Sequence, residues 1–150
     1  MDQTGVLGPT FDSTLIQRIL PHRYPFLFVD RITEFKPDER ITGIKNVTGS
    51  ERYMTAGSDG VPVMPIAILT ETVAQVGALL ILGKPENEGK LIYFMGMTRV
   101  RFRQPPRAGE VLEVTASVKR LRAKMGLLVG TGYVGRRRVI HGIMTFALGA

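Results

Sequence analysis

The sequence predicts an α+β fold in which a curled antiparallel sheet wraps around one long helix. Residues 65–82 are good helix formers with apolar side chains on nearly all sides, so this helix needs a covering layer. The segments after it read as long strands joined by short connections, which favours an antiparallel meander as that layer.

Length and composition favour a single domain. The chain has 150 residues, of which 44% are hydrophobic and 22% are charged, enough to bury one core. Residues 1–11 contain glycines and a proline without periodicity, so we expect a loose N-terminal arm there. Residues 12–150 are then the single domain.

A short helix and a hairpin are expected first. Asp12 or Ser13 can cap a helix whose apolar residues share one face, and Pro21 ends it. Residues 26–35 and 40–47 read as two strands joined by a turn at residues 36–39. A glycine-rich loop follows at residues 56–60.

The long helix and the strands after it come next. Pro65 stands where the first helical turn tolerates proline, and Gly83 is placed to end the helix. Apolar and polar residues alternate strictly from Leu112 to Lys119, which predicts that one sheet face is wet. The strands are expected at residues 90–103, 110–122, 125–135 and 138–148, with a loop at 104–109 and tight turns at 124–126 and 136–137.

Composition excludes several kinds of chemistry. The chain has no cysteine and only two histidines, so we expect no disulfide, no metal and no other cofactor. The longest nearly apolar run, residues 73–82, is too short to span a bilayer, and no leader opens the chain. We therefore expect a soluble, cytoplasmic protein.

The net charge of +7 favours an anionic partner. Arg99, Arg101 and Arg103 are spaced by two and so share one face of a strand. Such a row is either a solvated face or a grip for phosphate or an acidic protein. Aromatic residues do not interleave with it, which disfavours nucleic acid.

Glu71 is the most informative single residue. It is the only charged side chain between Asp59 and Lys84, and it lies midway along a helix that should have no wet face. Because burying an unpaired carboxylate is costly, either Gln75 satisfies it or it is a functional carboxylate. Alanines near the same face leave room for a ligand or a second subunit: Ala67, Ala74 and Ala78.

The segment of residues 57–66 leads into the long helix. Free N–H groups at a helix start can receive a carbonyl oxygen that becomes negative during reaction, although glycines that merely turn the chain explain the spacing more simply. The segment does not match a phosphate-binding loop. His22 and His141 are interpreted as structural or surface histidines rather than general bases.

Four sequence blocks stand in order along the chain. They are Leu-Pro-His-Arg-Tyr-Pro-Phe-Leu-Phe-Val-Asp-Arg at residues 20–31, Lys-Asn-Val-Thr with Glu51 at 45–51, Pro-Val-Met-Pro with Glu71 and Ala-Gln at 62–75, and Arg-Phe-Arg-Gln-Pro with Gly-Glu at 101–110. Together they resemble the β-hydroxyacyl-[acyl-carrier-protein] dehydratases of fatty-acid synthesis, a FabZ-like family of hot-dog proteins. The likeness covers nearly the whole chain after the arm.

The resemblance implies a hot-dog fold, a dimer and often a trimer of dimers. It implies that Glu71 pairs across the dimer with a histidine that removes the α-proton of a 3-hydroxyacyl thioester. That histidine position is Gly57 here, so the expected base is absent and Gly57→His should raise dehydration. Expected substrate-binding residues are Gly57, Asp59, Gly60, Val63, Pro65, Ile66 and Gln75, and the expected carrier-binding residues are Arg99, Arg101 and Arg103.

Three functions remain possible at this point. The first is binding of acyl carrier protein or coenzyme A thioesters with altered or impaired dehydration. The second is thioester hydrolysis, with Glu71 activating water and Asp59 assisting. The third is a non-catalytic subunit of a hetero-oligomer, whose sibling supplies the histidine facing Glu71.

Overall fold

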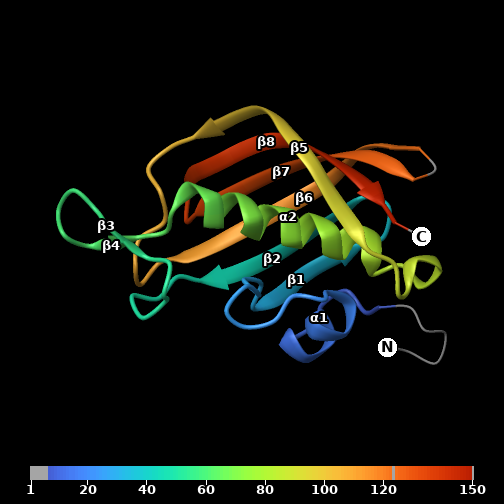
Figure 1. The fold of residues 1–150 in the computed structure, drawn as a ribbon, viewed down its shortest axis with the longest axis horizontal. Helices are drawn as coiled ribbons and strands as arrows, with labels where there is room; N and C mark the ends of the chain where they lie inside the picture. The colour runs from blue at the N-terminus through green and yellow to red at the C-terminus, as the bar shows by residue number, and fades with distance from the viewer. Residues whose placement is uncertain (1–6, 123, 150) are drawn as a thin grey trace.

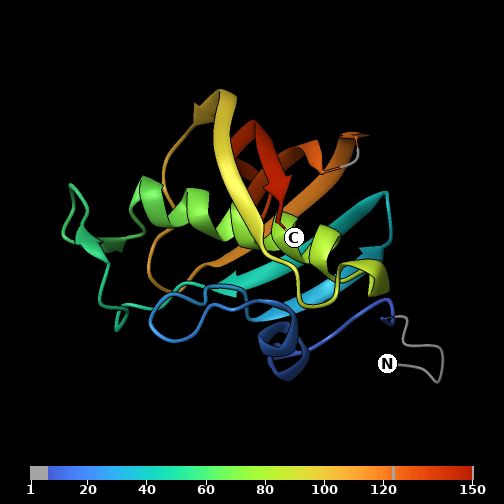
Figure 2. The ribbon, with the colours of Figure 1, turned by 45° about the vertical axis from the view of Figure 1, so that its right-hand side comes forward.

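A six-stranded antiparallel sheet curls around one 17-residue helix, α2 (Ile66–Leu82), as Figures 1 and 2 show. The computed structural model describes residues 7–122 and 124–149. Neighbouring strands follow the order β1-β2-β6-β7-β8-β5. The prediction of an α+β fold is confirmed, and the arrangement is the hot-dog fold that the resemblance implies.

The elements follow the expected sequence order. The sheet contains β1 (Arg31–Lys36), β2 (Arg40–Asn46), β5 (Ile92–Phe102), β6 (Val111–Arg122), β7 (Met125–Val134) and β8 (Arg137–Leu148). A separate small hairpin contains β3 (Thr55–Ala56) and β4 (Pro62–Val63). The other helices are α1 (Ser13–Ile19) and the 3-10 helix η1 (Pro85–Asn87).

Asp12, one of the two residues expected to cap the first helix, is the N-cap of α1. Its Oδ1 accepts hydrogen bonds from the backbone N–H groups of Thr14 (3.0 Å) and Leu15 (3.2 Å). Ile16 is completely buried, so the helix lies against the core on its apolar face.

The N-terminal arm is packed over the part that the structure describes. Leu7 and Phe11 are buried, and Phe11 exchanges two backbone hydrogen bonds with Ile32 of β1. Residues 7–11 are therefore held on the sheet instead of lying loose, and residues 1–6 of the expected arm lie outside the described residues.

The first expected strand, residues 26–35, is too long, since β1 begins only at Arg31. The backbone of Phe26 and Phe28 forms hydrogen bonds with the side chain of Gln75 on α2 instead of with another strand. The apolar run that suggested a strand is therefore a loop that runs along the central helix.

The meander after the long helix is shorter than expected. Of the four strands that follow α2, β6, β7 and β8 pair in sequence order, whereas β5 pairs with β8 at the far edge of the sheet. The loop after β5 is bonded to the segment before α2: its Pro106 carbonyl accepts from the Met64 N–H (2.8 Å) and its Ala108 N–H donates to the Pro62 carbonyl (2.9 Å). These bonds lead the chain past the start of α2 and into β6, beside β2.

Helix α2 is covered unevenly. Every residue from Gln75 to Leu82 is buried, as predicted, but Ile66 is 49% exposed and Glu71 is half-buried. The expectation of a helix with no wet face is therefore wrong for its first half. In Figure 1 the small β3–β4 hairpin extends away from the first turn of α2.

The core lies between α2 and the inner face of the sheet. Leu112, Val114 and Ala116 of β6 are fully buried, whereas Glu113 and Lys119 are exposed, which confirms the alternation predicted for this strand. Within the described ranges, no helix is long and apolar enough to cross a bilayer.

Glycine allows β7 to approach α2 closely. A Cβ atom on Gly130 would lie 2.4 Å from Cγ1 of Val73 and 3.0 Å from Cε of Met144. Real Cβ contacts are not this short, so the helix and the strand meet here only because the side chain is absent.

We predict that Gly130→Ala destabilises the protein. The steric cost of about 1–3 kcal/mol exceeds the roughly 0.4–1 kcal/mol by which alanine restricts the unfolded chain. Chemical denaturation at one protein concentration measures the free energy of unfolding. Gly49→Ala is the control, since its Cβ would meet only Ala108 Cβ at an ordinary 3.6 Å. Equal free energies of unfolding for the two variants would show that α2 and β7 do not pack tightly at Gly130.

Candidate active site

A cavity of about 260 Å³ lies beside the middle of α2. Its polar lining residues are His22, Glu71 and Gln75. Most of its wall is apolar and includes Phe26, Ala74, Tyr93, Phe94, Met144 and Phe146. An apolar cavity with a few converging polar groups is the usual form of a small-molecule site.

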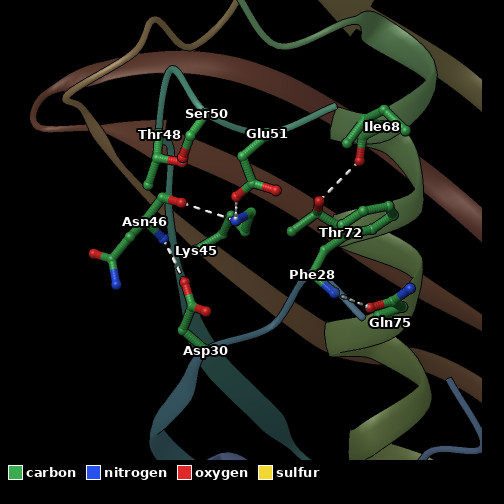
Figure 3. Close-up of polar contacts among 10 residues, drawn as sticks. All are labelled: Phe28, Asp30, Lys45, Asn46, Thr48, Ser50, Glu51, Ile68, Thr72 and Gln75. Carbon is green, nitrogen blue, oxygen red and sulfur yellow. Dashed lines mark hydrogen bonds and ion pairs between the residues drawn. The ribbon is translucent and has the colours of Figure 1, made fainter. Parts of the chain in front are cut away.

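Gln75 organises the polar side of this cavity. Its Nε2 donates to Glu71 Oε1 (3.0 Å) and to the Phe26 carbonyl (2.7 Å), and its Oε1 accepts from the Phe28 N–H (2.9 Å). Figure 3 shows the contact with Phe28. Gln75 does satisfy Glu71, as one interpretation of the sequence proposed, yet the Glu71 side chain remains 26% exposed at the cavity.

His22 approaches the same carboxylate. Its Nε2 lies 3.7 Å from Glu71 Oε1, and its side chain is 29% exposed. Its Nδ1 is buried and has no hydrogen-bond partner among the described residues. Sequence reasoning treated His22 as a structural or surface residue and missed this juxtaposition. The available signal was the position of His22 within the Leu-Pro-His-Arg-Tyr-Pro block.

The loop carrying His22 is held by its neighbour Arg23. The guanidinium donates to the backbone carbonyls of Leu20 (2.8 Å), His22 (2.7 Å) and Gln17 (2.8 Å). Because the last carbonyls of a helix lack helical partners, Arg23 both caps α1 and orients the His22 backbone. The ring of His22 also lies 5.8 Å from that of Phe26, centroid to centroid.

A second polar cluster is centred on Lys45, as Figure 3 shows. The buried ammonium of Lys45 forms an ion pair with Glu51 and donates to the Asn46 carbonyl (2.8 Å). Tyr53, two residues after Glu51, packs edge-on against Phe28 at 5.3 Å. Burial raises the pKa of the Tyr53 hydroxyl, so Tyr53 acts here as a neutral packing residue.

The expected substrate loop is the tip of the β3–β4 hairpin and does not line this cavity. Gly57 donates to the Val61 carbonyl (2.9 Å) and accepts from the Gly60 N–H (3.0 Å). A Cβ atom on Gly57 would lie 2.6 Å from that Val61 carbonyl. The turn therefore has no room for a side chain at the position where the resemblance places the base.

Asp59 on the same hairpin is already paired. It forms an ion pair with Arg107, whose guanidinium holds the pKa of the Asp59 carboxyl below its ordinary value. Neither Asp59 nor Val63 lines the cavity at Glu71, so one chain does not bring the expected loop residues and the carboxylate together.

The first backbone amides of α2 have no partner within the helix. The first helical N–H to donate within the helix is that of Leu69, which reaches the Pro65 carbonyl (3.0 Å), and Pro65 has no side-chain cap. The N–H groups of residues 66–68 are thus free of helical partners. With a rise of about 1.5 Å per residue, Ile66 lies about 7.5 Å along the axis from Glu71.

The expected row of three arginines is broken. A β-bulge lies between Thr98 and Arg101, and Arg99 has a φ of 53°, so Arg99 leaves the simple alternation. Arg101 lies opposite His141, and the end of β5 leads into the loop bonded to β4. The row therefore lies toward the start of α2, on the order of 20 Å along the strand from Phe94 at the cavity.

His141 lies away from Glu71 and fits the structural interpretation. Its Nδ1 is 2.9 Å from Oγ1 of Thr131 on the neighbouring strand. Across residues 7–122 and 124–149, no group of three or more acidic or histidine side chains is arranged to hold a metal ion.

Comparisons of sequence agree with this architecture. The FabA-like domain family matches residues 20–142. The 3-hydroxyacyl-[acyl-carrier-protein] dehydratase FabZ of Moorella thermoacetica is 44% identical over 138 residues, covering 92% of this chain and 96% of that protein. The corresponding FabZ of Bacillus velezensis is 41% identical over 138 residues, with 92% and 98% covered.

Solved structures share the fold at low sequence identity. A chain of the dehydratase heterocomplex ApeI:P from Xenorhabdus doucetiae superposes with a TM-score of 0.77 and 18% identity, covering 90% of this chain and 91% of that chain. The E. coli PaaI protein superposes with a TM-score of 0.63 and 14% identity, with 77% and 80% covered. The extent of the sequence matches shows that this chain belongs to the FabA-like family, alongside the FabZ dehydratases.

Proposed function

We propose that the protein is a cytoplasmic, oligomeric member of its family that binds 3-hydroxyacyl thioesters of acyl carrier protein or coenzyme A. In this proposal it dehydrates them to 2-enoyl thioesters, at a rate altered by the absence of a base at Gly57. The observation that carries the proposal is the Glu71 carboxylate, which Gln75 holds at the edge of an apolar cavity. Relatives with over 40% identity are 3-hydroxyacyl-[acyl-carrier-protein] dehydratases.

Each part of the site has a separate role in the proposed reaction. The apolar wall takes the acyl chain, and the free amides at the start of α2 stabilise negative charge on the thioester oxygen. Glu71 faces the 3-hydroxyl group and protonates it as it leaves. Gly57 has no side chain, so the proton on the α-carbon must pass to another group.

Two alternatives use the same site. In hydrolysis Glu71 would activate water, but Asp59 is bound to Arg107 and does not line the cavity, which removes the expected assistant. In a hetero-oligomer a sibling would supply the histidine. The ApeI:P assembly of Xenorhabdus doucetiae is a dehydratase heterocomplex, so an assembly of different chains has a precedent in this fold.

We predict that Glu71→Gln lowers dehydration by about 10²–10⁴-fold, because a positioned proton-transfer group is lost while the side-chain shape is kept. The assay follows enoyl absorbance and free thiol with a 3-hydroxyacyl thioester. Glu113→Gln, on the exposed face of β6, is the control and should be unchanged. Thiol release by the wild type would indicate hydrolysis instead, and absence of both products would indicate a binding subunit.

We predict that Gly57→His does not raise dehydration, contrary to the expectation from the resemblance alone. The new Cβ would meet the Val61 carbonyl at 2.6 Å, so the hairpin must open before a histidine fits. The same enoyl assay and a thermal unfolding scan compare this variant with Ser58→His at the exposed neighbouring position. A tenfold or larger increase in the rate of enoyl formation that is seen only in Gly57→His would contradict this prediction and support a general base at position 57.

We predict that Arg101→Glu and Arg103→Glu weaken binding of an acidic acyl carrier protein by about tenfold at low salt. The basic end of β5 attracts the carrier by charge, and salt screens such attraction. Titration calorimetry at two salt concentrations measures the effect. Arg120→Glu, at the opposite end of the sheet, is the control. Carrier affinity that does not depend on salt or on these arginines would contradict this placement.

A further inference from the structure

We propose that His22 is the proton acceptor that Gly57 cannot be, so that a single chain carries both members of the catalytic pair. The inference rests on the proposed dehydration and names the residue that this reaction still lacks. The resemblance assigns the base to the hairpin, whereas the geometry points to the loop after α1.

The two side chains meet in one cavity. His22 Nε2 lies 3.7 Å from Glu71 Oε1, and about a quarter of each side chain is exposed. Dehydration needs a proton acceptor at C2 and a proton donor at the hydroxyl on C3. These two carbon atoms are adjacent in the substrate. A proton acceptor and a proton donor separated by less than 4 Å can serve both positions of one substrate.

The ring has one nitrogen available for chemistry. His22 Nδ1 is buried and makes no hydrogen bond within the part of the chain that the structure describes, whereas Nε2 faces Glu71. Proton transfer to and from the cavity therefore takes place at Nε2.

Neighbouring residues fix the positions of His22 and Glu71. Arg23 binds the His22 carbonyl and the end of α1, and Phe26 packs on the imidazole. Gln75 donates to Glu71 and, with the same Nε2, to the Phe26 carbonyl. The Gln75 amide thus fixes the position of the Glu71 carboxylate and of the loop that carries His22. Acid–base catalysis needs this kind of pre-organisation.

The proposed step uses the free electron pair of His22 Nε2 and one proton carried by Glu71. Nε2 takes the C2 proton, and the electron pair of that C–H bond forms the C2=C3 double bond. The C3–O bond breaks, and the leaving hydroxyl takes the Glu71 proton and departs as water. His22 is then protonated and Glu71 ionised, and transfer of the proton between them restores the starting state without another reagent.

The first test uses the two histidines of the chain as a matched pair. His22→Asn should lower kcat for enoyl formation by about 10²–10⁴-fold, with KM and the binding of hexanoyl-CoA little changed. His141→Asn, which alters only the site beside Thr131, should keep the wild-type rate. An active wild type with equally active His22→Asn overturns the role of His22 and leaves the proposed function standing. An inactive wild type overturns both.

The second test does not depend on folding of a His22 variant. In His141→Asn, His22 is the only histidine left, so diethyl pyrocarbonate should abolish enoyl formation, hexanoyl-CoA should protect, and hydroxylamine should restore activity. Glu71→Gln combined with His22→Asn should lose little more than either change alone, because the two groups act as a unit. Activity that survives histidine modification contradicts the proposal.

Discussion

The buried amide of Gln75 is the interaction on which the rest of the site depends. It is 1% exposed and binds three partners, the Glu71 carboxylate, the Phe26 carbonyl and the Phe28 N–H. An apolar replacement would leave the Phe28 N–H buried and unpaired, at a cost of about 1–3 kcal/mol. The central helix and the N-terminal loop are joined at this residue, and the cavity lies where they meet.

Layers of packing stabilise this junction from both sides. On the sheet side, Gly77 and Gly130 let α2 approach β7 so closely that added Cβ atoms would meet Leu128 and Val73 at 3.0 and 2.4 Å. On the loop side, the Lys45–Glu51 ion pair holds the segment from which Tyr53 packs on Phe28. Close packing between α2 and β7 thus fixes the sheet side of the cavity, and the ion pair with the aromatic contact fixes the loop side.

Most elements were predictable because their signals are local. The helix at residues 66–82 follows from helix formers between Pro65 and Gly83, and β6 follows from its strict alternation. Two elements were not predictable in full. The run from Phe26 has the composition of a strand but forms hydrogen bonds with a side chain far along the sequence. Strand β5 pairs with β8 instead of with β6, the next strand along the chain, and its outgoing loop is bonded to β4.

The sequence by itself determined the fold class, the family, the lone carboxylate at Glu71 and the absence of a histidine at Gly57. Each of these depends on residue type at a position or on spacing within one segment. Only the tertiary structure decided that His22 lies beside Glu71, that Asp59 is paired with Arg107 and that Gly57 has no space for a side chain. Such contacts join residues far apart in the chain, so they depend on how α1, the loop after it and the hairpin fold against α2, and no local pattern records that path.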